Sequence, residues 1–135
     1  MGKYITEFIG TFFLVLTITL SVITQQPMAP LAIGGVLMVM VFMGGHISGA
    51  HYNPAVSLAV FLRGALPATE ILPYVAAQTL GGLAAAFLGN FIAGGSVAIA
   101  PGENVSLLAA IMVEFLFTFA LALTMLNVVT AKGTK

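Results

Sequence analysis

The sequence predicts an all-α membrane protein with four transmembrane helices and one short re-entrant half-helix. Of the 135 residues, 60% are hydrophobic and only 6% are charged, whereas soluble domains carry roughly 25% charged residues. Four apolar segments each have about the 20 residues that a membrane-spanning helix needs. One charge-free segment, residues 31–62, is too long for a single crossing and must break inside the membrane. Together these observations leave almost no sequence for a domain in water.

The first predicted span covers residues 5–24 and ends at the polar turn Gln25, Gln26 and Pro27. Lys3 before an apolar stretch is also typical of a secretory signal peptide. Glu7 lies inside this stretch, however, and no clear pattern of small residues for cleavage follows, which favours a retained helix.

The second predicted span covers residues 29–47, the third 71–92 and the fourth 105–129. Pro73 fits the first turn of the third helix, where its missing N–H leaves no helical hydrogen bond unmade. The resulting order is two spans, a broken segment and two further spans.

The broken segment predicts a re-entrant loop and half-helix over residues 44–62. As one helix, residues 31–62 would be about 48 Å long, against a hydrocarbon core of about 30 Å. Glycines and polar residues interrupt the segment at 44–54, and Asn53 and Pro54 fit the N-cap and first residue of a new helix. Irregular backbone at membrane depth lines a watery cavity or is buried in protein. We therefore expect a pore or an internal binding site, with an ordinary loop and Asn-Pro cap as the alternative.

The composition argues against several other functions. Four basic and four acidic residues give a net charge of zero, and nucleic-acid binding needs a clustered excess of basic residues. Without Cys the chain has no thiolate ligand or nucleophile. His46 and His51 have no third ligand nearby, which argues against a metal site. We expect no metal, no cofactor and no nucleic acid as partner.

Basic residues predict the orientation. If the amino terminus is cytoplasmic, all four basic residues, Lys3, Arg63, Lys132 and Lys135, fall on the cytoplasmic side, as the positive-inside rule requires. The sequence thus predicts a multi-pass integral protein of the cell or inner membrane with both termini in the cytoplasm.

An internal repeat relates the first span to the fourth. A shift of 107 residues aligns Glu7 with Glu114. In the sixteen-residue window that begins at Glu7, eight residues are identical to their aligned counterparts. Because three crossings separate the two copies, the second runs in the opposite direction, which is the arrangement of an inverted repeat. The second copy contains only its first helix here, so we expect the chain to be a truncated part of a longer protein.

The opening residues 7–11 and the run from Gly45 to Val56 closely resemble the aquaporin and glycerol-facilitator family, the major intrinsic proteins. The resemblance implies an aquaporin-like bundle, half of a six-helix fold. Residues 1–104 would form the first repeat, and residues 105–135 the first helix of an incomplete second repeat. It also implies a homotetramer in the lipid bilayer and a second Asn-Pro-Ala loop outside this chain.

The resemblance implies roles for single residues as well. The pore motif would be Asn53, Pro54 and Ala55. The backbone carbonyls facing the pore would be those of Gly49, Ala50, His51 and Tyr52. Ile33 falls at the selectivity-filter position of the second helix, where an aliphatic residue departs from the common water-specific pattern. Residues expected to support the re-entrant loops are Glu7, Glu114, His46 and Gln78.

The leading functional prediction is a passive, single-file channel, not an enzyme, for water or small uncharged solutes. Water, glycerol, urea and ammonia all remain open as solutes. One alternative is a proton-coupled transporter that uses the intramembrane carboxylates of Glu7 and Glu114. Another is a non-conducting half-channel that needs a partner.

Overall fold

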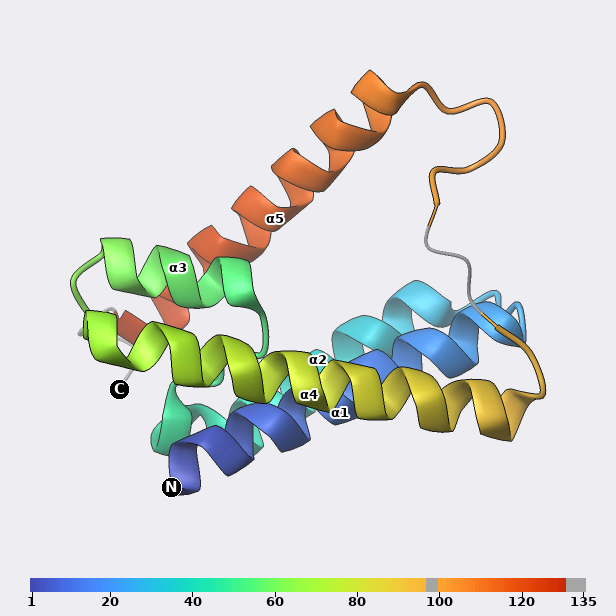
Figure 1. Ribbon diagram of the computed structural model, residues 1–135. Coiled ribbons are helices and arrows are strands. Elements are labelled where there is room, and N and C mark those ends of the chain that lie inside the picture. Colours follow the sequence, from blue (N-terminus) through green and yellow to red (C-terminus); the bar gives the residue numbers. More distant parts are fainter. Residues whose placement is uncertain (97–99, 131–135) are drawn as a thin grey trace. The chain divides into compact units, whose positions relative to one another are not determined.

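The computed structural model describes residues 1–96 and 100–130 and confirms the predicted all-helical class (Figure 1). The described residues form five helices: α1 (Gly2–Ile23), α2 (Ala29–Ser48), α3 (Pro54–Leu62), α4 (Ala68–Ala93) and α5 (Leu107–Thr130). All except α3 are long and apolar enough to cross a membrane. Helices α1 to α4 belong to one compact unit, residues 1–97, and α5 belongs to a second, residues 98–135. The two units are described separately.

The helix bounds differ slightly from those expected. Helix α2 continues to Ser48, one residue beyond the predicted end, and Gly49 closes it in the left-handed conformation, with φ 86°. Helix α4 begins at Ala68, three residues early, because Pro67 is extended and serves as its N-cap. Pro73 therefore lies in the second turn of α4 and not in the first, so its missing N–H leaves one helical carbonyl without its usual donor.

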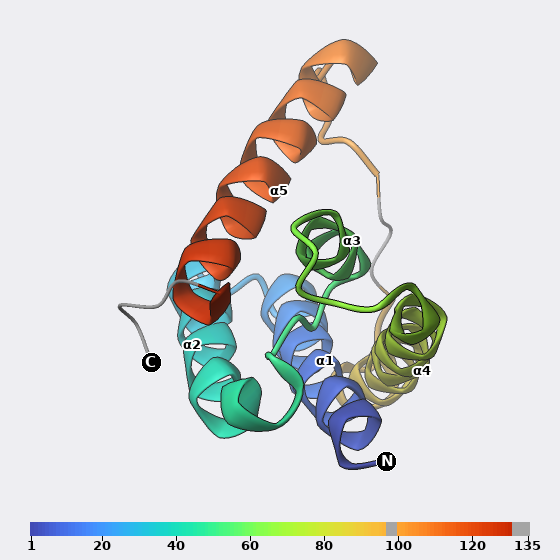
Figure 2. The ribbon, with the colours of Figure 1, turned by 90° about the vertical axis from the view of Figure 1, so that its left-hand side faces the viewer.

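Helix α1 is the central helix of the first unit. Seen along the helices, it lies between α2 and α4 (Figure 2), and it packs against both, while α3 packs against α4. Glu7 contacts Gln78, and further along both helices Thr19 lies against Gly89, so α1 and α4 run parallel. Helix α2 runs in the opposite direction (Figure 1). The end of α2 and the start of α4 thus lie at the same end of the unit, and residues 49–67 enter and leave from that end.

The buried face of α1 is made of small and polar residues. The buried residues of α1 are Thr6, Glu7, Gly10, Thr11, Thr19 and Ser21. Large apolar side chains such as Ile5, Ile9 and Phe13 are exposed instead. This distribution suits a lipid environment, in which helices associate through small residues and interhelical hydrogen bonds because the solvent itself is apolar.

The contact between α1 and α4 depends on glycine. The buried face of α4 repeats every three or four residues, at Tyr74, Gln78, Gly81, Ala85 and Gly89. A Cβ added to Gly81 would lie 2.5 Å from the carbonyl oxygen of Phe8. The bare backbone at Gly81 therefore lets the two helices approach closely, and this approach brings Gln78 within reach of α1.

Candidate functional site: the re-entrant loop

Glu7 is the centre of the site and is fully buried. Four donors converge on its carboxylate. Oε1 accepts from the Ser48 hydroxyl at 2.6 Å and from the His51 backbone N–H at 2.9 Å. Oε2 accepts from the Tyr52 backbone N–H at 2.7 Å and from Nε2 of Gln78 at 2.8 Å. One side chain of α1 thus binds the end of α2, the loop that follows it and α4.

These four bonds satisfy the hydrogen-bonding capacity of Glu7. A carboxylate has two oxygens with about four acceptor positions, and here each oxygen receives two donors. In return, two backbone N–H groups of an irregular segment find an acceptor, which they need once they are removed from water. The sequence predicted that Glu7 supports the loop; that role stays a prediction, and these four bonds are the contacts from which it can be argued.

The loop backbone is folded to present those N–H groups. Gly49, Ala50 and Tyr52 all have positive φ, at 86°, 52° and 49°. For residues other than glycine this left-handed conformation is uncommon and costs energy. Such turns aim successive N–H groups into one concavity, which favours an anion. The Glu7 carboxylate occupies the concavity and compensates for the strain of the turn.

Asn53 joins the loop to α3. It is extended, with φ −154° and ψ 131°, and its Oδ1 accepts a hydrogen bond from the Ala55 N–H at 2.7 Å. Pro54 follows as the first helical residue, a position where no N–H is needed. Because the cap uses only the side-chain oxygen, the NH2 group of the Asn53 amide is not engaged in capping. It lies at the positive end of the α3 dipole.

A second layer of buried polar groups connects the loop to α3 and α4. Nε2 of Gln78 donates to the Ser57 hydroxyl at 2.9 Å, and Ser57 Oγ lies 3.1 Å from Nδ1 of His51. The Ser57 hydroxyl has one proton and two acceptor positions, so it can accept from Gln78 and donate to Nδ1 of His51 at the same time. In that arrangement the proton of a neutral His51 ring resides on Nε2.

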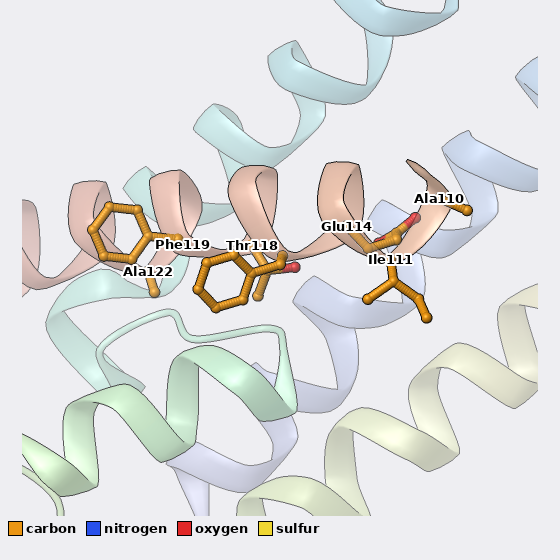
Figure 3. A pocket seen from close by; sticks show the side chains of 7 residues that line it. Ala110, Ile111, Glu114, Thr118, Phe119 and Ala122 are labelled. Carbon is orange, nitrogen blue, oxygen red and sulfur yellow. The ribbon is translucent and has the colours of Figure 1, made fainter. Parts of the chain in front are cut away.

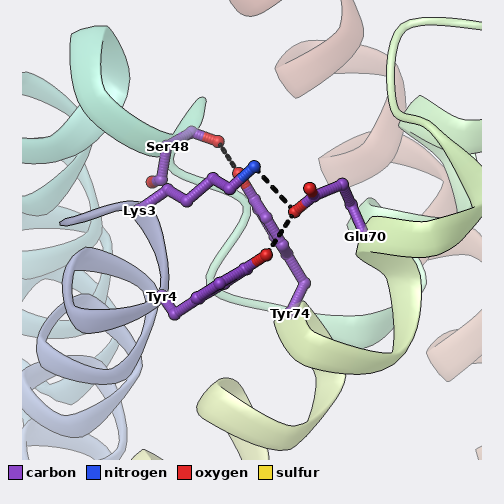
Figure 4. A network of polar contacts seen from close by, with 5 residues as sticks. All are labelled: Lys3, Tyr4, Ser48, Glu70 and Tyr74. Atoms are coloured by element: carbon purple, nitrogen blue, oxygen red, sulfur yellow. Dashed lines mark hydrogen bonds and ion pairs between the residues drawn. The ribbon is translucent and has the colours of Figure 1, made fainter. Parts of the chain in front are cut away.

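A third set of contacts lies at one end of the unit (Figure 4). The Lys3 ammonium is 2.8 Å from Oε2 of Glu70, and the same oxygen accepts from the Tyr4 hydroxyl at 2.8 Å. The Tyr74 hydroxyl donates to the Ser48 carbonyl, also at 2.8 Å. These contacts connect α4 to the first turn of α1 and to the last residue of α2, next to the loop.

Two residues expected in the site lie apart from this network. His46 is exposed, and no hydrogen bond among the described residues joins its side chain to the loop. Helix α2 continues to Ser48, which binds Glu7, and two residues along a helix point about 200° apart. The supporting role expected of His46 stays a prediction. Ile33 is half-buried on α2, and its predicted filter role stays a prediction.

The second unit presents Glu114 on one face of α5 (Figure 3). This face bears a shallow hollow lined by Ala110, Ile111, Glu114, Phe115, Thr118, Phe119 and Ala122. Glu114 and Thr118 are the counterparts of Glu7 and Thr11 in the internal repeat. The support that Glu114 would give to a second loop stays a prediction.

Comparison with known proteins decides the family. The sequence pattern of the major intrinsic proteins matches residues 1–135 of the chain. The chain belongs to the major intrinsic protein family. Proteins of this family are channels and not enzymes, in agreement with the expectation from the sequence.

Curated relatives of this major intrinsic protein include several bacterial proteins named Aquaporin Z. The chain is 36% identical to that of Brucella melitensis biotype 1 over 139 residues, covering 87% of this chain and 61% of the relative. It is 39% identical to that of Bradyrhizobium diazoefficiens over 115 residues, covering 78% of this chain and 46% of the relative. The chain spans about half the length of the curated relatives it matches.

Sequence reasoning missed three polar partners in this major intrinsic protein, the side chains of Ser48, Ser57 and Tyr74. Ser57 and Tyr74 lie among apolar neighbours, where a single polar residue has no distinctive pattern. Ser48 lies in the polar interruption at 44–54, but nothing in the sequence marked it as a partner of Glu7. One signal was available: Tyr74 and Gln78 are four residues apart, so they share a face of α4, and Gln78 was already expected to face inward.

Proposed function

We propose that the chain forms part of a passive membrane channel for water or small uncharged solutes. The observation that carries the proposal is the Asn53 amide at the start of α3. Its oxygen is used by the helix cap, while its NH2 group is left to donate to a solute oxygen. Family membership and the similarity to proteins named Aquaporin Z support the same function.

The chemistry of the loop suits neutral solutes. The NH2 group of Asn53 supplies donors, and the carbonyls of residues 49–52 supply acceptors for a file of water or polyol molecules. The α3 dipole places roughly half a positive charge at its amino terminus, which opposes cations. A neutral solute that leaves bulk water can replace its hydrogen bonds to water by hydrogen bonds to the Asn53 NH2 group and the loop carbonyls, and it meets no net charge there.

A proton-coupled transporter is the weaker alternative. A carrier carboxylate must gain and lose a proton during transport. Both oxygens of Glu7 already accept two hydrogen bonds each, so a proton on Glu7 would displace a donor that holds the loop. This geometry supports a structural role for Glu7.

The remaining parts of the proposal concern the assembly. We propose that both termini face the cytoplasm, since this orientation places the four basic residues on that side. A complete pore would pair α3 with an equivalent half-helix, supported by Glu114, from the part of the relatives that this chain does not cover. The channel would assemble as a homotetramer in the bilayer.

Asn53→Asp tests the proposed solute contact. The Asp side chain keeps an oxygen for the Ala55 cap but removes the NH2 donors and adds a negative charge at the end of the α3 dipole. We expect water permeability to fall roughly tenfold, as for the loss of about one hydrogen bond, and cations to begin to leak. Stopped-flow shrinkage and ion-flux assays would use proteoliposomes with the gene product that carries this chain.

The matched control for this variant is Asn104→Asp, which adds the same charge at an exposed loop position. Its water and cation permeabilities should equal those of the unchanged protein. If Asn53→Asp behaves in the same way as this control, Asn53 does not contact the solute. Saturable, pH-dependent flux in the unchanged protein would favour the transporter instead, and no flux at all would favour a non-conducting half-channel.

A further inference from the structure

Tyr52 is anchored at both ends, by its backbone to α1 and by its side chain to α2. Its N–H donates to Oε2 of Glu7 at 2.7 Å, and its hydroxyl donates to the Met40 carbonyl at 2.8 Å. The residue is only 2% exposed. Its φ of 49° lies in the left-handed region, which residues other than glycine rarely adopt. The two hydrogen bonds therefore stabilise an otherwise unfavourable backbone conformation.

The ring of Tyr52 occupies a slot that two glycines create. A Cβ added to Gly10 of α1 would overlap the ring, and a Cβ added to Gly44 of α2 would overlap the hydroxyl. A Cβ on the neighbouring Gly45 would meet nothing within 4 Å. The bare backbone at Gly10 and Gly44 thus makes room for this side chain between the helices.

The anchoring bears directly on Asn53, the next residue. Fixing the backbone N–H and the ring of Tyr52 leaves little freedom for the peptide that joins Tyr52 to Asn53. The orientation of that peptide sets the direction of the Tyr52 carbonyl. It also sets the position of the Asn53 Cα, from which the side-chain amide extends. Asn53 itself is bound to α3 by its side-chain cap with Ala55 and by its carbonyl, which accepts from the Ser57 N–H at 3.0 Å. On the loop side, its position depends on the residue before it.

We propose that Tyr52 is a positioning residue, whose hydroxyl bond to Met40 and slot at Gly10 and Gly44 fix the Asn53 amide and the neighbouring carbonyls toward the solute. The inference rests on the proposed channel function. The sequence reasoning assigned only the backbone of Tyr52 to the pore. The side chain adds a connection from α2 to the solute path, independent of the Glu7 carboxylate.

Tyr52→Phe isolates the hydroxyl, because the ring still fills the slot. The matched control is Tyr4→Phe, which also removes a phenol hydrogen bond, here to Glu70 at the end of the unit. We expect water permeability of proteoliposomes with Tyr52→Phe to fall about threefold to tenfold, the range for one lost hydrogen bond. The ratio of glycerol to water permeability should also change. Tyr4→Phe should leave both quantities unchanged.

Amide hydrogen exchange provides a readout that does not depend on transport. In Tyr52→Phe the amides of residues 51 and 52 should exchange about threefold to tenfold faster, while the unfolding temperature in detergent stays close to that of Tyr4→Phe. Equal permeability and equal exchange in the two variants would overturn the positioning role. If the unchanged protein conducts no water, the channel proposal fails, and the exchange rates alone then decide whether Tyr52 holds the loop.

A second pair of variants tests the slot. Gly44→Ala should displace the Tyr52 hydroxyl and reproduce the faster exchange at residues 51 and 52, whereas Gly45→Ala, with open space around it, should not. Unchanged exchange in Gly44→Ala would show that the ring does not depend on the slot and would count against the proposal.

Discussion

Replacing Glu7 by Gln is expected to have the largest effect of any single substitution in the first unit. The Gln side chain offers one acceptor oxygen in place of two, and its NH2 group would face two of the four donors that now bind the carboxylate. Each buried donor left unpaired costs about 1–3 kcal/mol. We therefore expect the free energy of unfolding to fall by about 2–6 kcal/mol and water permeability to be lost.

The measurement is denaturant unfolding in detergent micelles, followed by osmotic shrinkage of proteoliposomes. Glu103→Gln is the matched control, since Glu103 is exposed and loses the same charge without a buried network around it. The account of Glu7 would be wrong if Glu7→Gln unfolded within experimental error of Glu103→Gln.

Gly81→Ala is expected to have the next largest effect, through the backbones of α1 and α4. The added methyl would lie 2.5 Å from the Phe8 carbonyl oxygen and 3.3 Å from the Phe12 nitrogen. Both are backbone atoms that cannot rotate away, so the helices must separate. Overpacking of this kind costs about 1–3 kcal/mol. Separation would also draw Gln78 away from Glu7, so water permeability should fall together with stability.

The adjacent Gly82 offers a close control. A Cβ there would lie 3.7 Å from a methyl group of Val15, an ordinary contact, and alanine is the better helix former. Gly82→Ala should therefore unfold at the same denaturant concentration as the unchanged protein or a slightly higher one. Equal stability of the Gly81→Ala and Gly82→Ala variants would argue against close contact between α1 and α4.

The sequence predicted the elements of this fold better than its contacts. Apolar segments of spanning length and the Asn53-Pro54 pair identify helices because they follow local rules of length and capping. The partners of Glu7 are not local, since they depend on how closely α4 approaches α1. That approach is set by Gly81, whose importance appears only when the backbone of Phe8 is seen beside it.

His46 illustrates the same limit. The sequence places His46 and His51 within one polar interruption of the broken segment, and His46 was expected to support the loop that contains His51. The structure separates them, because α2 ends only after His46 and its last turn decides which side chains face inward. A shift of one or two residues in a helix end rotates the inward position by 100° to 200°, more than sequence patterns can resolve.

The donors on Glu7 also bear on how the protein is made. They lie 41, 44, 45 and 71 residues later in the chain. At a ribosomal rate of about 5–20 residues per second, several seconds pass between synthesis of Glu7 and arrival of Gln78. During that interval the first helix enters the bilayer with a carboxylate that lacks its native partners. The set of hydrogen bonds on Glu7 is therefore complete only when the third long helix, α4, has been synthesised, and slow translation between the two helices would prolong the time during which the carboxylate lacks Gln78.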